Sequence, residues 1–162
     1  MLLYIVRHAW AEDRDPEKFP NDDLRPLTSD GKKRFTKTVK RLVDGGCCPA
    51  LVATSPLVRC RQTADILTER LENGTKIVEL DALRPGSDLA ELVRWTSEQS
   101  EEAIAWVGHA PDVSELAAAL IGDGIPSIRF TKGATAAIEF TGKIAPGKGE
   151  LNWLATAKLL GC

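Results

Sequence analysis

The sequence opens on Leu2-Leu3-Tyr4-Ile5-Val6-Arg7-His8, a continuous apolar run that ends in an arginine and a histidine. A short run of this kind, rich in residues that favour β-structure, predicts a strand that is buried on both faces. Strands buried on both faces are typical of parallel sheets that helices cover on both sides. The first residues therefore favour an α/β fold in which Arg7 and His8 lie at the carboxyl end of the first strand.

The chain then alternates between short apolar runs and segments with helical periodicity. A second buried strand is expected at residues 51–53, a third strand at 76–80 and a fourth, apolar throughout, at 103–107. The first helix is expected between the capping residues 28–30 and the glycines at 45–46, and the second between the N-cap Ser55 with the first-turn Pro56 and the stop signal Asn73-Gly74. The third is expected from Ser87, and the fourth after the turn at residues 108–111.

Two segments depart from this alternation. Residues 12–25 are charged, and the prolines at 16, 20 and 26 predict a surface loop without regular structure. Residues 134–140 and 151–156 are extended runs on either side of a glycine-rich turn at 142–149, which predicts a hairpin at one side of the sheet. We therefore expect a single domain over residues 1–162, a three-layer αβα sandwich with a mostly parallel central sheet and a C-terminal hairpin.

Composition excludes several classes of protein. Hydrophobic residues make up 43% and charged residues 27%, which is the range of globular domains rather than of disordered chains. The net charge of −2 offers no positive field for nucleic acid, so no nucleic-acid partner is expected. No stretch approaches the roughly 18 apolar residues that a membrane span needs. With no signal peptide recognisable, we expect a cytoplasmic protein without a membrane partner.

The four cysteines are too few and too unevenly spaced for a disulfide framework, and their spacing does not fit a zinc site. Chemistry is instead expected where the predicted parallel strands end, because ligands in such sheets bind at the carboxyl ends of the strands. The only two histidines in the sequence, His8 and His109, both lie there, as do Arg7 and Arg59. Arginine grips phosphate oxygens in pairs, and a neutral imidazole nitrogen can attack phosphorus, while an imidazolium can neutralise the phosphoryl oxygens. These residues predict a metal-free phosphoryl-transfer site.

Three segments resemble the motifs of the histidine phosphatase superfamily, which includes the phosphoglycerate mutases. Leu3-Tyr4-Ile5-Val6-Arg7-His8 is similar to its RHG signature, residues 55–63 (SPLVRCRQT) to its SPxxRxxQT motif, and residues 107–111 (VGHAP) to its third motif. The short length, residues 25–28 (RPLT) and residues 83–86 (LRPG) resemble the SixA-type phosphohistidine phosphatases within it. The resemblance implies a phosphoglycerate mutase-like fold.

The resemblance also implies roles for individual residues. His8 would be the phosphorylated nucleophile, with Arg7, Arg59 and His109 binding the phosphoryl group. Arg25, the arginine of the RPLT segment, would join them. Ala9 replaces the glycine of the signature, which would cost energy if the backbone there required a positive φ; we expect the methyl group to be tolerated.

The leaving group separates the candidate substrates. A phosphate ester needs a proton donor, for which Glu79 and Asp81 are the candidates, whereas imidazole can leave protonated near neutral pH. The leading hypothesis is a phosphatase without cofactor that removes phosphate from a histidine of a phosphocarrier or phosphotransfer protein. The alternatives are a small-molecule phosphomonoesterase that uses Glu79 or Asp81 as general acid, and an inactive phosphoprotein-binding module.

Three further features have two interpretations each. Trp10 follows the RHG-like segment and either lines the mouth of the pocket or packs against the rest of the protein. Arg84 reaches either the pocket rim or a salt bridge within its loop. The basic run at residues 32–41 is either a solvated helix face or a docking surface for an acidic partner, whereas Arg61 is expected to be a solvated charge on the second helix.

Overall fold

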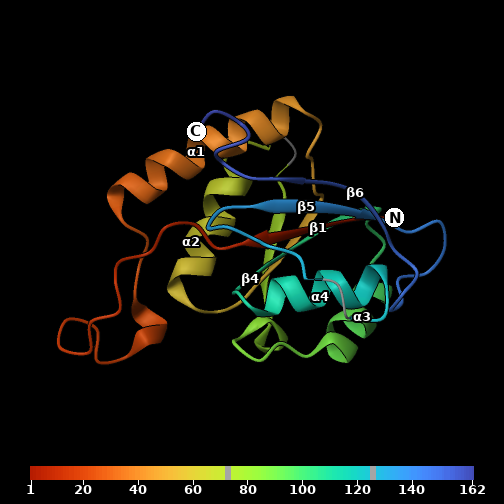
Figure 1. The fold of residues 1–162 in the computed structure, drawn as a ribbon, viewed down its shortest axis with the longest axis horizontal. Helices are drawn as coiled ribbons and strands as arrows, with labels where there is room; N and C mark the ends of the chain where they lie inside the picture. Colours follow the sequence, from red (N-terminus) through yellow and green to blue (C-terminus); the bar gives the residue numbers. More distant parts are fainter. Residues whose placement is uncertain (72–73, 125–126) are drawn as a thin grey trace.

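The computed structural model describes residues 1–71, 74–124 and 127–162. Within them, the chain forms a six-stranded sheet and four α-helices (Figure 1). The strands are β1 (Leu2–Arg7), β2 (Leu51–Thr54), β3 (Lys76–Glu79), β4 (Ala103–Gly108), β5 (Thr135–Glu139) and β6 (Glu150–Ala155). The helices are α1 (Ser29–Asp44), α2 (Val58–Thr68), α3 (Leu89–Ser97) and α4 (Asp112–Ile121), with short 3-10 helices η1 (Asp22–Leu24) and η2 (Asp81–Leu83).

The sheet has the strand order β3-β2-β4-β1-β5-β6. The pairs β2/β3, β2/β4 and β1/β4 are parallel, whereas β5 runs antiparallel to β1, and β6 antiparallel to β5. The four strands that follow the helical alternation thus form the parallel part of the sheet, and the C-terminal hairpin extends it on the β1 side. The predicted α/β class and the mostly parallel sheet with its hairpin are confirmed.

Two hydrophobic layers hold the helices against the sheet. Side chains along β1 alternate between them: Leu3 and Ile5 pack in the layer under α3 and α4, and Tyr4 packs in the layer under α1 and α2. Figure 1 shows α1 and α2 on one side of the strands and α3 and α4 on the other. The apolar run of β1 is therefore buried on both faces, and the sandwich has the expected three layers. None of the described helices is long and apolar enough to cross a membrane.

Two helix starts differ from the sequence expectation. Helix α2 begins at Val58 behind Leu57, which makes no side-chain cap, and not at Ser55-Pro56. The Ser55 hydroxyl accepts from Leu57 N–H at 3.4 Å and also lies 2.9 Å from His109 Nε2, so the expected cap residue contacts the second histidine as well. Helix α3 begins at Leu89, because the Asp88 carboxylate caps it by accepting from Glu91 N–H, rather than at Ser87.

The end of α2 was expected at Asn73-Gly74, but the helix ends at Thr68, and Asn73 lies outside the described residues. The segment at 12–25 was expected to lack regular structure, which is wrong at its end. The Asn21 side chain accepts from Asp23 N–H and caps the 3-10 turn η1, and the backbone N–H of Arg25 closes the turn on the Asp22 carbonyl. This turn places Asp22 and Arg25 beside the strand ends.

Candidate active site

The two histidines lie side by side because their strands are neighbours in register. Arg7 of β1 pairs with Gly108 of β4, so that the next residues, His8 and His109, leave the sheet together. The His8 N–H donates to the Gly108 carbonyl at 2.9 Å, and the two ring centroids are 5.4 Å apart. Both side chains are buried, at 8% and 4% exposure. The expectation that both histidines lie at strand carboxyl ends is confirmed.

The His8 ring has a fixed tautomer. Its Nδ1 lies 2.7 Å from the carbonyl oxygen of Ala9, and since a carbonyl only accepts, Nδ1 carries the proton and donates it. Nε2 is then the nitrogen with the lone pair. Burial lowers the pKa of His8 to about 3, although the Ala9 hydrogen bond opposes this shift; the charges of His109, Arg59 and Arg7 add to it. At neutral pH, His8 is a neutral imidazole with a nucleophilic Nε2.

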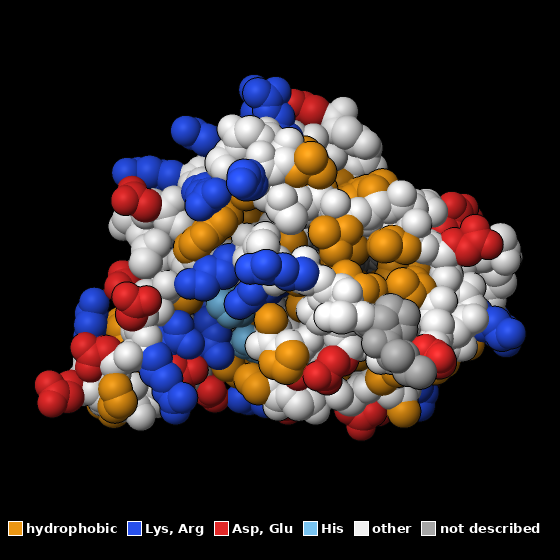
Figure 2. Space-filling view, viewed as in Figure 1, with side chains coloured by type: hydrophobic (Ala, Val, Ile, Leu, Met, Phe, Trp, Pro, Cys, Tyr) orange, Lys and Arg blue, Asp and Glu red, His pale blue; other side chains and the backbone are white. Residues whose placement is uncertain are grey.

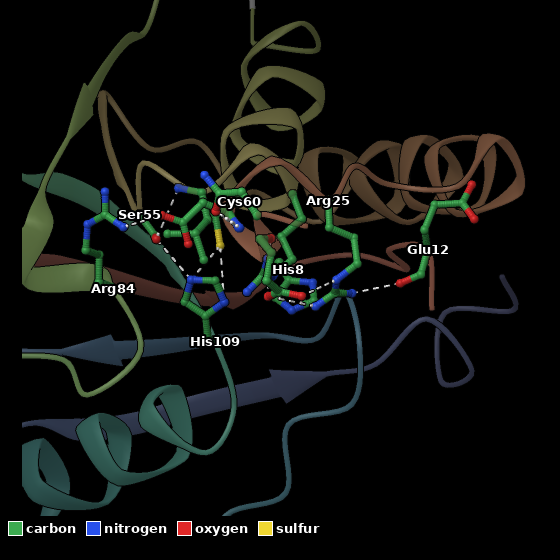
Figure 3. A network of polar contacts seen from close by, with 12 residues as sticks. His8, Glu12, Arg25, Ser55, Cys60, Arg84 and His109 are labelled. Carbon is green, nitrogen blue, oxygen red and sulfur yellow. Dashed lines mark hydrogen bonds and ion pairs between the residues drawn. The ribbon is translucent and has the colours of Figure 1, made fainter. Parts of the chain in front are cut away.

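The His109 ring contacts two side chains of the β2–α2 segment. Its Nε2 lies 2.9 Å from Ser55 Oγ and 3.4 Å from Cys60 Sγ (Figure 3). Burial lowers the pKa of His109 to about 4, with the charge of Arg59 acting in the same direction. Burial raises the pKa of Cys60 to about 12, so its thiol is protonated. In the free protein, these surroundings keep His109 neutral near pH 7, as a hydrogen-bonding group; an imidazolium facing a bound phosphoryl group stays a prediction.

Half-buried Arg7 and buried Arg59 both bring positive charge close to His8. Arg7 Nη1 donates to the Phe130 carbonyl at 2.8 Å, and Arg59 Nη1 donates to the Asp22 carbonyl at 2.9 Å. Among the described residues, the buried Nε–H groups of both arginines have no hydrogen-bond partner. Burial is the main cause of the lowered pKa of each guanidinium. Since an unsatisfied buried donor is costly, each of these Nε–H groups would gain from a hydrogen bond to a bound anion.

Arg25 joins this cluster through a carboxylate. Its Nε donates to Asp22 Oδ1 at 2.8 Å and its Nη2 to Asp22 Oδ2 at 3.3 Å, while its Nη1 donates to the Glu12 carbonyl at 2.7 Å. Asp22 Oδ2 also lies 3.3 Å from Arg59 Nη1. The hydrogen bond from Arg25 is the largest cause of the lowered pKa of Asp22, so this carboxyl group is ionised. Sequence analysis missed Asp22, because a lone aspartate in a charged loop carries no motif.

A threonine of α2 links the His8 loop to the helix that carries Arg59. The N–H of Ala9 donates to Thr63 Oγ1 at 3.0 Å, and this hydroxyl donates to the Arg59 carbonyl at 2.7 Å. The methyl group of Ala9 is fully buried. Among the described residues, positive φ angles occur only at glycines. Ala9 therefore adopts an ordinary backbone conformation, and the expectation that its methyl group is tolerated is confirmed.

The two candidate acids lie in exposed ion pairs. Glu79 Oε1 is 3.0 Å from Arg61 Nη1, and Asp81 Oδ1 is 2.7 Å from Arg84 Nε. Arg84 also reaches Asp23 of η1 at 2.9 Å, so the salt-bridge interpretation of Arg84 holds, with one partner beyond its own loop. Arg61 is a half-exposed helix charge, as expected. The structure thus brings His8, His109 and the arginines at 7, 25 and 59 together. Glu79 pairs with Arg61, and Asp81 pairs with Arg84, which joins the polar network of the site through Asp23 (Figure 3).

Trp10 packs against the start of α1. Its ring lies under the guanidinium of Arg34, whose central carbon is 4.2 Å from the ring centroid. Its carbonyl accepts from Thr28 N–H at 2.9 Å. The space above Gly133 is also filled by this ring, since a Cβ there would lie 3.1 Å from Trp10 Cζ3. The packing interpretation of Trp10 is confirmed.

Figure 2 shows Lys and Arg side chains gathered around the histidines on this face.

Comparison with known proteins places this arrangement in a family. The model of the histidine phosphatase superfamily (branch 1) matches residues 3–119. An uncharacterized protein of Picosynechococcus sp. is 38% identical over 124 residues, which cover 74% of this chain and 73% of the relative. The chain therefore belongs to the histidine phosphatase superfamily. Membership in this superfamily makes the chain a phosphatase, a hydrolase, and confirms the predicted family and enzyme class.

Solved structures share the fold over almost the whole chain. The protein histidine phosphatase SixA in complex with tungstate superposes with a TM-score of 0.85 at 24% identity, covering 99% of both chains. The putative phosphohistidine phosphatase SixA from Agrobacterium tumefaciens gives 0.77 at 24% identity, covering 96% of this chain and 97% of the other. A putative alpha-ribazole-5'-P phosphatase from Escherichia coli gives 0.69 at 19% identity, covering 97% and 98%. The fold is phosphoglycerate mutase-like, as expected.

Proposed function

We propose that this phosphatase is of the SixA type and removes phosphate from a histidine of a phosphocarrier or phosphotransfer protein. The phosphoryl group is transferred first to His8 and then to water. The observation that carries the proposal is the fixed His8 tautomer, whose Nδ1–H donates to the Ala9 carbonyl at 2.7 Å and leaves Nε2 as the nucleophile. Arg7, Arg59 and His109 stand around it as phosphoryl-binding groups.

The transfer step needs no protein acid when the substrate is phosphohistidine. His8 Nε2 forms a bond to phosphorus while the substrate's P–N bond breaks, and the departing imidazole carries the proton that it took up from water. The second step breaks the P–N bond of phospho-His8 as water attacks, and releases inorganic phosphate. Buried guanidinium donors stabilise the charge on the phosphoryl oxygens in both steps, which needs no cofactor.

The carboxyl groups near the site support this substrate class. Asp22 approaches the arginines, but it is ionised through its hydrogen bond from Arg25 and so has no proton to give at neutral pH. Glu79 and Asp81 are engaged by Arg61 and Arg84. A phosphate ester, which needs its alkoxide protonated, is served less well by these groups than an imidazole leaving group. The alternative, a phosphomonoesterase using Glu79 or Asp81, requires those ion pairs to open.

The test measures phosphate release from a carrier protein phosphorylated on histidine and, separately, from a panel of phosphate esters. We expect rapid release from the carrier, slow release from esters, and a phosphorylated His8 peptide detectable by mass spectrometry after rapid quenching. His8→Ala should lower carrier turnover by about 10⁴-fold or more, because it removes the nucleophile.

Two outcomes would change the assignment. Preference for a small ester would move the protein to the metabolite phosphatases. Wild-type protein that binds the phosphorylated carrier but forms no phosphoenzyme would identify a binding module. Arg61→Ala, which alters an exposed charge on α2, is the control for non-specific effects of substitution.

A further inference from the structure

The three arginines of the site differ in how many of their donors the protein already uses. Arg7 and Arg59 each keep a buried Nε–H without a partner among the described residues. Arg25, by contrast, directs its Nε and Nη2 to the two oxygens of Asp22, and its Nη1 to the Glu12 carbonyl. The Nε/Nη2 edge is one of those with which arginine grips a phosphate in pairs. At Arg25 this edge is taken by a carboxylate.

Asp22 also reaches into the part of the site formed by Arg59. Its Oδ2 lies 3.3 Å from Arg59 Nη1, the same distance that separates it from Arg25 Nη2. One carboxylate thus bridges two guanidiniums, as a phosphoryl group would. Figure 3 shows Arg25 within the polar network that contains His8, with the contact to Glu12 on its far side.

The position of Asp22 makes its release inexpensive. The residue belongs to a three-residue 3-10 turn, and 37% of its side chain is exposed to solvent. Leu24 in the same turn is 62% exposed, so few apolar contacts hold the turn down. A carboxylate that leaves the guanidiniums from this position enters water rather than an apolar core.

We propose that Asp22 is an internal counter-anion of the phosphoryl site, which the substrate's phosphoryl group displaces from Arg25 and Arg59. This inference rests on the phosphoryl site proposed above, and deepens it by adding a residue that sets affinity. Arg7 and Arg59 receive the phosphoryl group first, and Arg25 contributes its paired donors once Asp22 has released them. Displacement lowers the affinity for every phosphate anion, including the inorganic phosphate that the reaction produces.

The test is a calorimetric titration with inorganic phosphate, which needs neither a carrier protein nor turnover. Asp22→Asn keeps the size of the side chain and removes its charge. We expect the Kd of this variant for phosphate to fall roughly tenfold, because the substitution removes the partly screened negative charge that competes with phosphate for Arg25 and Arg59. The matched control is Asp23→Asn: Asp23 follows in the same turn, with 46% side-chain exposure, pairs with Arg84, and its charge acts on Arg59 more weakly than that of Asp22. Its Kd should change less than about twofold.

A second variant assigns the gain to Arg25. In the Asp22→Asn/Arg25→Ala double variant, the tighter binding should disappear, because the released donors are gone. An unchanged or higher Kd for Asp22→Asn would overturn the proposal and make Asp22 a residue that only positions the two arginines. Asp22→Ser, with the same expected direction, replaces Asp22→Asn if thermal unfolding shows that the latter does not fold.

These results separate the two proposals. Tighter phosphate binding without turnover of phosphohistidine would retain Asp22 as the counter-anion and reject the proposed substrate. Turnover of phosphohistidine with no change in phosphate affinity would do the reverse.

Discussion

Arg59 and Arg61 lie two residues apart on α2 and occupy opposite environments. Arg59 is buried, has an Nε–H without a partner among the described residues, and has a pKa lowered chiefly by burial. Arg61 is half-exposed, is hydrogen-bonded to Asp65 and Glu79, and has a raised pKa for that reason. Arg61 is thus paired with two carboxylates, whereas Arg59 keeps a buried donor that no described residue uses. A buried cation with an unused donor lowers the stability of the free protein, and a bound anion relieves this cost.

Of the two arginines, the buried one should give by far the larger effect when it is removed. Arg59→Ala should lower kcat/KM for dephosphorylation of the phosphorylated carrier by about 10²–10³-fold, because a donor to the developing phosphoryl charge is lost. Arg61→Ala should change it by less than about twofold, as expected for an exposed ion pair. Steady-state phosphate release measures both. Equal losses in the two variants would remove the functional distinction between the clusters.

The next largest effect concerns the two buried histidines. The pKa of His8 is lowered to about 3 and that of His109 to about 4, so the folded protein stays unprotonated at both sites while an unfolded chain takes up protons below about pH 6.5. The unfolded state binds more protons, and stability therefore rises with pH in this window and is lost as the pH falls. The expected slope is about 1.4 kcal/mol per pH unit for each histidine.

Chemical denaturation at a series of pH values between about 6.5 and 4 would measure this slope. The control is the His8→Gln/His109→Gln double variant, which lacks both titrating groups and should lose that part of the pH dependence. Parallel curves for wild type and variant would show that the histidines are not held neutral by the fold.

A smaller effect is expected in the exposed clusters that contain the candidate acids. Glu79→Gln and Asp81→Asn should each change phosphate release from the carrier by less than about threefold, because both carboxylates lie in solvent-exposed ion pairs. Assays of each variant on phosphate esters complete the test. A loss of ester turnover alone, of tenfold or more, would favour the phosphomonoesterase hypothesis.

The smallest effect should appear at Ala9. Because its φ is not positive, Ala9→Gly relieves no strain; it removes a buried methyl group and increases the freedom of the unfolded chain, so the free energy of unfolding should fall by about 1–2 kcal/mol. Activity on the carrier should stay within about twofold. Thermal unfolding compared with wild type is the measurement, and a stabilised variant would mean that the methyl group is strained after all.

The sheet and the core of the site were predictable from the sequence because each depends on a regular pattern. Apolar runs locate the buried strands, and the rule that ligands bind at strand carboxyl ends selects His8 and His109. The start of α2 was not predictable. Serine is a residue type that favours helix N-caps, but the Ser55 hydroxyl contacts His109, which lies 54 positions away in the sequence. A local signal cannot report a partner that only the folded sheet brings near.

Asp22 shows the same limit more strongly. It lies in a segment whose prolines and charges predict an irregular loop, and its significance depends on pairing with Arg25 in its own turn and with Arg59 on α2. Neither contact can be inferred from a hydrophobic period or from a motif that contains Asp22. The sequence therefore predicts the cationic groups of the site, while the anion that neutralises part of their charge is visible only in three dimensions.

The register of β1 and β4 has a consequence for how such a protein can change. The separation of the two histidine rings is fixed by backbone hydrogen bonds between adjacent central strands, from Leu2 opposite Ala103 to Arg7 opposite Gly108. Changes in surface loops and surface charges therefore leave the separation of the two histidine rings unaltered. The spacing of the two histidines is thus a property of the sheet, whereas Arg25, Arg59 and Asp22 come from the segments that follow or join its strands.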